Sequence, residues 1–115
     1  TMRNRPEALY LDGSALITRH RAPIAEFAIR HRLATCYVGR AHALAGVLVT
    51  YGFNIEENYR AAASYVDRIL KGEKPADLPM QQPSKFEMVV NLRTARAIGV
   101  TIPQSILLRA DELIE

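Results

Sequence analysis

Short apolar segments alternate with helix-like segments along the chain, and only a few residues separate one from the next. The apolar segments have the length and the aliphatic or β-branched composition of strands. They lie at residues 8–11, 33–38, 47–51 and 86–90. Parallel strands need a crossover between them, and a helix is the usual crossover. The alternation therefore predicts an α/β fold in which helices cover a parallel sheet.

The composition fits one folded domain. At 115 residues, with 49% hydrophobic and 23% charged residues, the chain is long enough to bury a core. Fifteen Lys and Arg against twelve Asp and Glu leave a formal charge of +3, and the basic residues are scattered. Nucleic-acid binding needs a continuous basic stripe with aromatic residues beside it, so nucleic acid is not an expected partner. No apolar run has the length of a membrane span, and membrane insertion is not expected.

Two helices are expected in the first half of the chain. The first begins at Thr18, interpreted as its N-cap, and runs to residue 31 with Pro23 in its opening turns. The second covers residues 40–45 and ends at Gly46, because glycine readily adopts the left-handed conformation that follows a helix. The strand segment 8–11 before them is purely apolar, so it is expected to be buried on both faces.

Residues 54–71 form the clearest helix in the sequence. Asn54 is its predicted N-cap, and Glu57, three residues later, completes a capping-box pattern. Apolar residues then recur at three and four residues, with charged residues on the opposite side. Such a helix is expected to lay its apolar face on the sheet or on a neighbouring helix.

The last third of the chain begins with a proline-rich segment. Residues 73–84 contain three prolines and are expected to be an extended connector. Asn91 then caps a predicted helix that Gly99 ends, and another helix is expected at residues 104–109. The terminal residues 111–115 form either a short edge strand or a frayed tail. Thr1 and Met2 are interpreted as a tag or start remnant before a single domain.

The sequence lacks the common motifs for dinucleotides, P-loop phosphates, zinc proteases and serine hydrolases. Its histidines, His20, His31 and His42, are evenly spaced. His20 and His31 would lie about 16 Å apart on one helix, too far to share a metal ion. All three are interpreted as surface or boundary residues, and Cys36, the sole cysteine, as a buried inert thiol. Neither enzyme activity nor a cofactor or metal is expected.

Three strand-to-helix loops are predicted to open on one edge of the sheet. They cover residues 12–18, 39–40 and 51–54, and ligands of open α/β sheets bind at the carboxyl ends of the strands. Hydroxyls, a guanidinium, an aromatic ring and a helix N-terminus suit a small carboxylate or zwitterion. The same residue types also serve as turn and cap residues in any α/β domain, and that alternative stays open. The candidate ligand-binding residues are Ser14, Thr18, Arg40, Tyr51, Gly52 and Asn54.

Three stretches carry a family resemblance over nearly the whole chain. They are Tyr51-Gly52-Phe53-Asn54-Ile55, the helix end at residues 65–72, and the whole segment at residues 74–115, whose most specific part runs from KPADLP to QPSKFE. Together they resemble the C-terminal part of ABC-transporter solute-binding proteins. The particular branch is the "uncharacterized ABC transport system, periplasmic component" family, which includes the TrpX-like binders of aromatic amino acids.

This resemblance implies a three-layer lobe that forms one half of a type I periplasmic-binding-protein fold. In that fold two α/β lobes are joined by crossing segments and close on a ligand between them. The chain would be the C-terminal part of such a protein. The resemblance further implies a periplasmic location and ABC permease subunits as partners. It places Tyr51 and Gly52 and the loop before Thr18 at the cleft, and residues 79–84 near the crossing segments.

The chain departs from the family at three places. Ser14, Leu16 and Ile17 stand where the family usually shows an acidic residue with aromatic residues. Arg40-Ala41-His42 replaces Arg-Glu-Phe, and Gly46-Val47 replaces a pair of glycines. The first two changes fall in the expected cleft loops, so the resemblance leaves the identity of the solute open.

Two functions follow from these expectations. The first is a solute-binding component of an ABC importer, or its C-terminal lobe, which binds a small organic solute such as an amino acid. The second is a truncated lobe that binds no solute and self-associates through its uncovered surfaces, because half of a two-lobed fold leaves apolar surface open. A homo-oligomer is expected in this shortened form.

Overall fold

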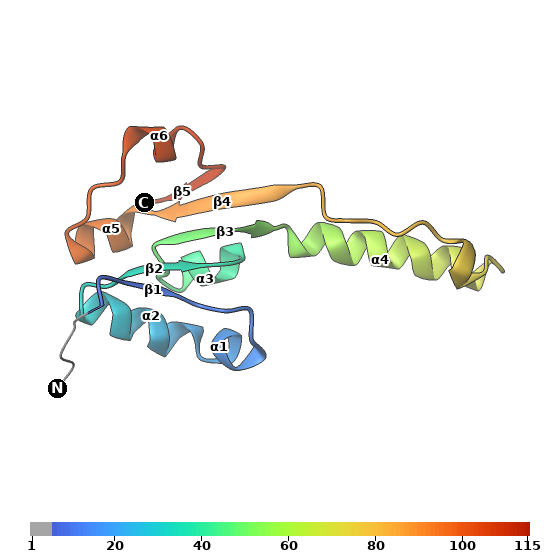
Figure 1. Ribbon diagram of the computed structural model, residues 1–115, viewed down its shortest axis with the longest axis horizontal. Coiled ribbons are helices and arrows are strands. Elements are labelled where there is room, and N and C mark those ends of the chain that lie inside the picture. The colour runs from blue at the N-terminus through green and yellow to red at the C-terminus, as the bar shows by residue number, and fades with distance from the viewer. Residues whose placement is uncertain (1–5) are drawn as a thin grey trace.

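Five strands form a single sheet in the order β1-β2-β3-β4-β5 (Figure 1). The computed structural model describes residues 6–115, so Thr1 and Met2, interpreted above as a remnant, lie outside the described residues. Neighbouring strands in the sheet are also consecutive in the chain. The strands are β1 (Ala8–Tyr10), β2 (Ala34–Tyr37), β3 (Val49–Phe53), β4 (Phe86–Asn91) and β5 (Glu112–Ile114).

Helices connect the strands and pack against them. In the described part of the chain, α2 contacts β2 and α5, whereas α3 contacts β3 and β4. The expected helix at 104–109 is shorter, and the terminal segment is an edge strand. The helices are α1 (Ala15–Arg19), α2 (Arg21–Arg30), α3 (Arg40–Leu44), α4 (Ile55–Leu70), α5 (Leu92–Ile98) and α6 (Gln104–Leu107), with a 3-10 turn at Pro75–Asp77.

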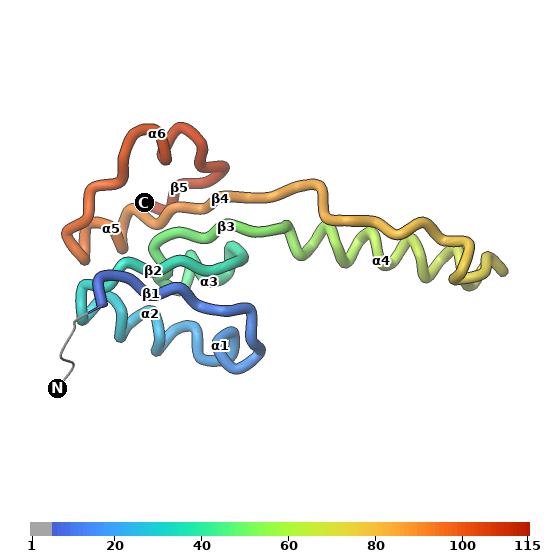
Figure 2. Tube along the Cα trace, in the orientation of Figure 1, coloured from blue at the N-terminus to red at the C-terminus, as the bar shows by residue number. Residues whose placement is uncertain are grey.

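The sheet is mixed. β1–β2, β2–β3 and β4–β5 pair in parallel, as expected, but β3 and β4 pair antiparallel from Val49↔Val90 to Phe53↔Phe86. The reason is that α4 is not a crossover. It leads away from the end of β3, and residues 71–85 bring the chain back beside it, so β4 re-enters the sheet in the opposite direction (Figure 2).

Two strand predictions were wrong in detail. β1 is an edge strand, and Tyr10 is 77% exposed, so the segment is not buried on both faces. The third strand begins at Val49 and runs to Phe53, two residues later than expected. Pairing with β4 decides these limits, because each residue from Val49 to Phe53 has a partner on β4. Tyr51 and Gly52 therefore lie within the strand, not in a loop after it.

The predicted helix from Thr18 to residue 31 is two helices that meet at His20. Thr18 is not an N-cap, because it lies inside α1. The cap is Ser14, whose Oγ accepts a hydrogen bond from the backbone N–H of Ile17 at 3.3 Å. Pro23 does lie in the first turn of α2, where its missing N–H costs nothing. His20 and His31 flank α2 as its caps and are not both inside one helix.

Asn91 ties the sheet to two helices. Its Oδ1 accepts from the Thr94 N–H at 2.9 Å and caps α5, as predicted, and Gly99 ends that helix at φ 76°. Its Nδ2 donates to the carbonyl of Ala43 in α3 at 2.8 Å. Beside it, Leu48, Ala95 and Ile98 form a buried cluster. The core of this lobe thus contains a polar side chain whose bonds are all satisfied internally, as burial demands.

The expectation that α4 covers the sheet or another helix was wrong. No residue of α4 is buried, and its apolar side chains are exposed, Leu70 to 82%. We call α4 and residues 71–85 the arm. Figure 1 shows it projecting from the sheet, and the molecule measures 59 × 34 × 20 Å with a radius of gyration of 17.9 Å. A compact chain of this length would have a radius near 13 Å.

The arm is held together by polar contacts between its two halves. Tyr65 Oη donates to the Pro79 carbonyl at 2.5 Å, and Lys85 Nζ pairs with Glu57 at 3.0 Å. Arg68 forms a two-bond ion pair with Glu73 where the chain turns back. These contacts set the path of the returning segment, but they leave the apolar stripe of α4 open to solvent.

Replacing Asn91 by alanine should lower the free energy of unfolding by about 2–3 kcal/mol, because the change removes a helix cap and one of the two hydrogen bonds to the Ala43 carbonyl, which keeps only the bond from the Gly46 N–H. Urea unfolding followed by circular dichroism would measure it. Asn54→Ala is the matched control, since Asn54 caps the solvent-exposed α4, and its loss should cost about 1 kcal/mol. Equal losses in the two variants would contradict this account of the core.

Candidate functional site

The carboxyl ends of β1, β2 and β3 lie along one edge of the sheet, because the three strands are adjacent and parallel. The loops after β1 and β2 open there, as the sequence predicts. β3 contributes the end of the strand itself, since it continues to Phe53 and passes directly into α4 through Asn54. We call this place the carboxyl edge.

The first two elements of the carboxyl edge meet through hydroxyl groups. Thr18 Oγ1 lies 3.4 Å from Tyr37 Oη, which joins α1 to the end of β2. The backbone carbonyl of Thr18 also accepts from Arg21 Nη1 at 3.0 Å. Ser14 is half-buried at the start of α1, and its hydroxyl is used in capping. Of these two predicted residues, Thr18 is therefore the one in contact with β2.

A buried aromatic pair lies behind this contact. The rings of Tyr37 and His42 are 4.0 Å apart between centroids and tilted by 52°. His42 is only 7% exposed, and in the described part of the chain neither of its ring nitrogens has a hydrogen-bond partner. Thr50, the neighbour of Tyr37 across β2 and β3, likewise has a buried hydroxyl without a partner there. The interpretation of all three histidines as surface or boundary residues is wrong for His42.

Burial lowers the pKa of His42, and the nearby positive charge of Arg21 lowers it further. Backbone groups of Gly39 and Val38 beside the ring offset only part of this effect. Both main causes favour the neutral ring. One feature of the sequence does indicate that His42 is buried: it stands where the resembled family has phenylalanine.

Arg40 is engaged within the protein. Its Nε and Nη2 donate to the two carboxylate oxygens of Glu112 on β5, at 2.6 and 2.8 Å. The bond to Glu112 raises the pKa of Arg40, and the same bond lowers the pKa of the Glu112 carboxyl. The guanidinium thus ties the N-terminus of α3 to the far edge of the sheet. A ligand carboxylate would have to share it with Glu112 or displace Glu112 from it.

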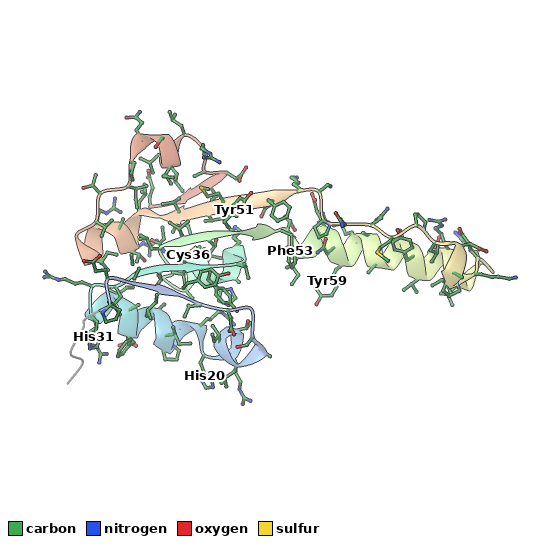
Figure 3. All side chains as sticks on the ribbon, viewed as in Figure 1. His20, His31, Cys36, Tyr51, Phe53 and Tyr59 are labelled. Carbon is green, nitrogen blue, oxygen red and sulfur yellow. The ribbon has the colours of Figure 1, made fainter. Side chains whose placement is uncertain are left out.

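Aromatic side chains line the outer part of β3. Tyr51 is 54% exposed and stacks on Phe86 of β4, with the centroids 5.7 Å apart and the rings inclined by 23°. Phe53 is also exposed, and Tyr59 lies further out on α4 (Figure 3). Together Tyr51 and Phe86 present a double aromatic surface next to the start of the arm.

Gly52 is buried beside these rings for a packing reason. A Cβ added there would lie 3.1 Å from Cβ and 3.3 Å from Cγ1 of Val38, which is closer than carbon atoms normally approach. Its backbone has an ordinary negative φ, since it is absent from the glycines with positive φ. Gly52 therefore allows β3 to pass close to the end of β2, and its predicted place at the edge follows from that contact.

Asn54 has the capping role that the sequence predicts. Its Oδ1 accepts from the Glu57 N–H at 3.1 Å, and its Nδ2 donates to Glu87 Oε1 at 2.5 Å. The reciprocal bond of a capping box is not formed, because Glu57 pairs with Lys85 and the Asn54 N–H donates to the Lys85 carbonyl. The polar groups of Asn54 are thus already used inside the protein.

Two open grooves are present, of which the first borders the carboxyl edge at Asn54 and the second lies away from it. One of about 470 Å³ runs between α4 and the returning segment of the arm, and its lining includes Asn54, Tyr65 and Gln81. The other, of about 250 Å³, lies between α2, α3 and α5 and includes Gly46 and Thr94 in its wall. Among the predicted site residues, only Asn54 lines either of them.

Residues 6–115 contain no group of three or more His, Cys, Asp and Glu placed to hold a metal ion. Cys36 is half-buried, and burial raises the pKa of its thiol, which disfavours the reactive thiolate. Among the described helices, none is both long and apolar enough to span a membrane.

The chain belongs to the family of ABC transporter substrate binding proteins, which its residues 14–114 match. This is a family of transport proteins and not of enzymes. No curated protein matches the sequence.

Solved structures have the same fold at low sequence identity. A conserved domain protein from Vibrio cholerae is 22% identical, with a TM-score of 0.87 over 93% of this chain. An ABC domain from Streptococcus pneumonia in complex with L-Trp is 24% identical, with a TM-score of 0.84 over 94%. A ligand-free, open substrate binding protein with adhesive properties from Clostridium difficile is 18% identical, with a TM-score of 0.60 over 93%.

These likenesses confirm the predicted α/β lobe of the periplasmic-binding-protein type. The chain spans only 36%, 38% and 36% of the length of the three solved chains, in the same order. Because the matches extend over nearly all of this chain, they include the arm as well as the sheet.

Gly52→Ala should destabilise the protein by about 1–2 kcal/mol, since the new methyl group would overlap the stiff side chain of Val38. Thermal unfolding would measure the loss, and changing Val38 to alanine as well should relieve only part of it, because Cγ1 is removed while the closest atom, Cβ, remains. Gly13→Ala is the control, because nothing lies within 4 Å of an added Cβ there. An unchanged melting temperature in Gly52→Ala would show that the close approach is not as tight as described.

Proposed function

We propose that the chain is the C-terminal lobe of a solute-binding protein that delivers a small organic molecule, such as an amino acid, to an ABC importer. The observation that carries the proposal is the family match over residues 14–114. Residues at the carboxyl edge supply the chemistry: the hydroxyls of Ser14 and Thr18 and the aromatic surface of Tyr51. No covalent step is involved, and the solute is held by hydrogen bonds and stacking.

The aromatic pair favours a solute with a planar or apolar side chain. Tyr51 and Phe86 already lie in a stacked arrangement, and an added ring would extend the stack at little conformational cost. The bound L-Trp of the Streptococcus relative is consistent with this choice. Arg40 and Glu112 carry the two charges that a zwitterion needs, but the solute would reach them only by sharing or opening their ion pair.

The arm supports a two-lobed protein. It leaves the sheet at Asn54 and returns at Lys85, and the two crossing points are joined by the bond from the Asn54 N–H to the Lys85 carbonyl at 3.3 Å. We propose that a second lobe covers the apolar stripe of α4 and that the two strand ends at this point act as crossing segments. Closure of the lobes on a solute would then give the ABC permease a shape to recognise. The proposed location is the periplasm.

Isothermal titration calorimetry with a panel of amino acids tests the solute role. Binding is expected for at least one aromatic or large apolar amino acid, and Tyr51→Ala should weaken it by about threefold to tenfold, because a stacking partner is worth about 0.5–1.5 kcal/mol beyond its area. Phe27→Ala is the matched control, since Phe27 is an exposed aromatic residue on α2, close to the end that leads into the start of β2 and away from the carboxyl edge. The absence of heat with every amino acid, both from this chain and from a two-lobed version, would refute the proposal.

The exposed stripe on α4 favours a second candidate function, a self-associating module. Self-association predicts that light scattering detects a dimer and that Val66→Glu with Leu70→Glu returns it to a monomer, because both side chains are exposed and apolar. Arg60→Glu, a charge change at an exposed position of α4, is the control and should leave the dimer intact. A monodisperse monomer over a wide concentration range would rule this candidate out.

A further inference from the structure

Helix α3 has five residues and fixes the loop that connects it to β2. Gly39, at φ 84°, precedes the helix, and Arg40 is its first residue. The helix is fixed to the rest of the lobe at three points. Arg40 reaches Glu112, the Ala43 carbonyl accepts from Asn91, and the ring of His42 packs on Tyr37.

Only the His42 contact depends on a group that titrates near neutral pH. The ring packs against the uncharged side chain of Tyr37 on β2, and α3 as a whole packs on β3 and β4. The charged group that acts on it is Arg21 on α2, and its own helix carries Arg40, which Glu112 neutralises. Within the described residues, no carboxylate is among the groups that influence His42.

We propose that His42 is a positioning residue that holds the Gly39–Arg40 loop at the carboxyl edge only while its ring is uncharged. A neutral ring packs against Tyr37 as an aromatic side chain would, with Nδ1 facing the backbone at Gly39, 3.8 Å from where a Cβ of Gly39 would lie. A protonated ring becomes a donor at both nitrogens. Within the described residues no side-chain acceptor reaches either nitrogen, the backbone groups of Gly39 and Val38 offset only part of the cost of charging the ring, and Arg21 repels the charge.

The direction of the pH effect follows from linkage. Because the pKa of His42 is lower in the folded protein than in the unfolded chain, the folded state binds fewer protons near the ordinary histidine pKa of about 6.5. Stability of α3 is therefore complete above that pH and decreases as the pH falls below it. Any change in solute affinity at low pH rests on the proposed function. The loosening of α3 at low pH does not.

Amide hydrogen exchange on the solute-free protein tests the release directly. The reporting amides are those of Ala45, Gly46 and Val47, which donate to carbonyls of α3. Between about pH 7.5 and about pH 5, their protection, corrected for intrinsic exchange, should fall several-fold. The amides of Val100 and Asp111, bonded to Ala95 and Met88, are the internal reference and should change less.

Two variants separate the histidine from general acid effects. His42→Phe keeps an aromatic ring against Tyr37 and should abolish the fall in protection. His20→Gln, at an exposed histidine, should keep it. A ring titration of His42 by NMR in the wild-type protein should give a pKa below the ordinary histidine value, and it remains informative if His42→Phe folds poorly.

The proposal is overturned if His42→Phe loses protection at low pH as the wild type does, or if the wild type keeps its protection and His42 titrates at the ordinary histidine pKa. A pH-dependent α3 in a protein that binds no amino acid would refute the proposed function alone. Solute binding with an α3 that is insensitive to pH would refute the His42 proposal alone.

Discussion

The antiparallel pairing of β3 with β4 is the constraint on which the rest of the structure depends. Five residue pairs, from Val49↔Val90 to Phe53↔Phe86, hold the two ends of the arm side by side. The pairing places Tyr51 and Phe86 close enough to stack, and it sets the register that brings Asn91 beside α3 and α5. Without it, β4 and β5 would not join the sheet of β1, β2 and β3.

Helix α3, at the carboxyl edge, is held by two contacts that do not titrate near neutral pH and by one that does. Arg40 with Glu112 is a two-bond ion pair, and Asn91 satisfies both a helix cap and a buried carbonyl. His42, by contrast, is buried with no hydrogen bond in the described part of the chain to fix its charge state. A small helix with two firm attachments and one titratable one is well suited to change the position of a single loop while the sheet stays intact.

Local signals in the sequence predicted the elements that local interactions determine. Asn91 and Gly99 bound α5, and Asn54 caps α4, because capping depends on residues within a few positions of one another. Signals that depend on distant partners were misread. Thr18 and Ser14 are equally good caps by residue type. The direction of β4 is set by an arm that does not cross the sheet.

The candidate site shows the same division. The convergence of the strand ends followed from the predicted parallel order, and Thr18 does reach Tyr37. The ion pair between Arg40 and Glu112 could not be predicted from the sequence, because 72 positions separate the two residues. The burial of His42 depends on how α3 packs on β3 and β4, which no local pattern encodes. In the sequence, the apolar pattern of α4 is the same as that of a helix that covers a core, so its exposure could not be predicted.

The most direct test of the central claim is a titration of the protein with an aromatic amino acid, followed by backbone amide chemical shifts in NMR spectra. The account predicts that the largest shifts fall at the carboxyl edge, in Ser14 to Thr18, Gly39 to Arg40 and Tyr51 to Asn54. Shifts confined to the groove between α4 and residues 81–85, or no shifts at any accessible concentration, would contradict it.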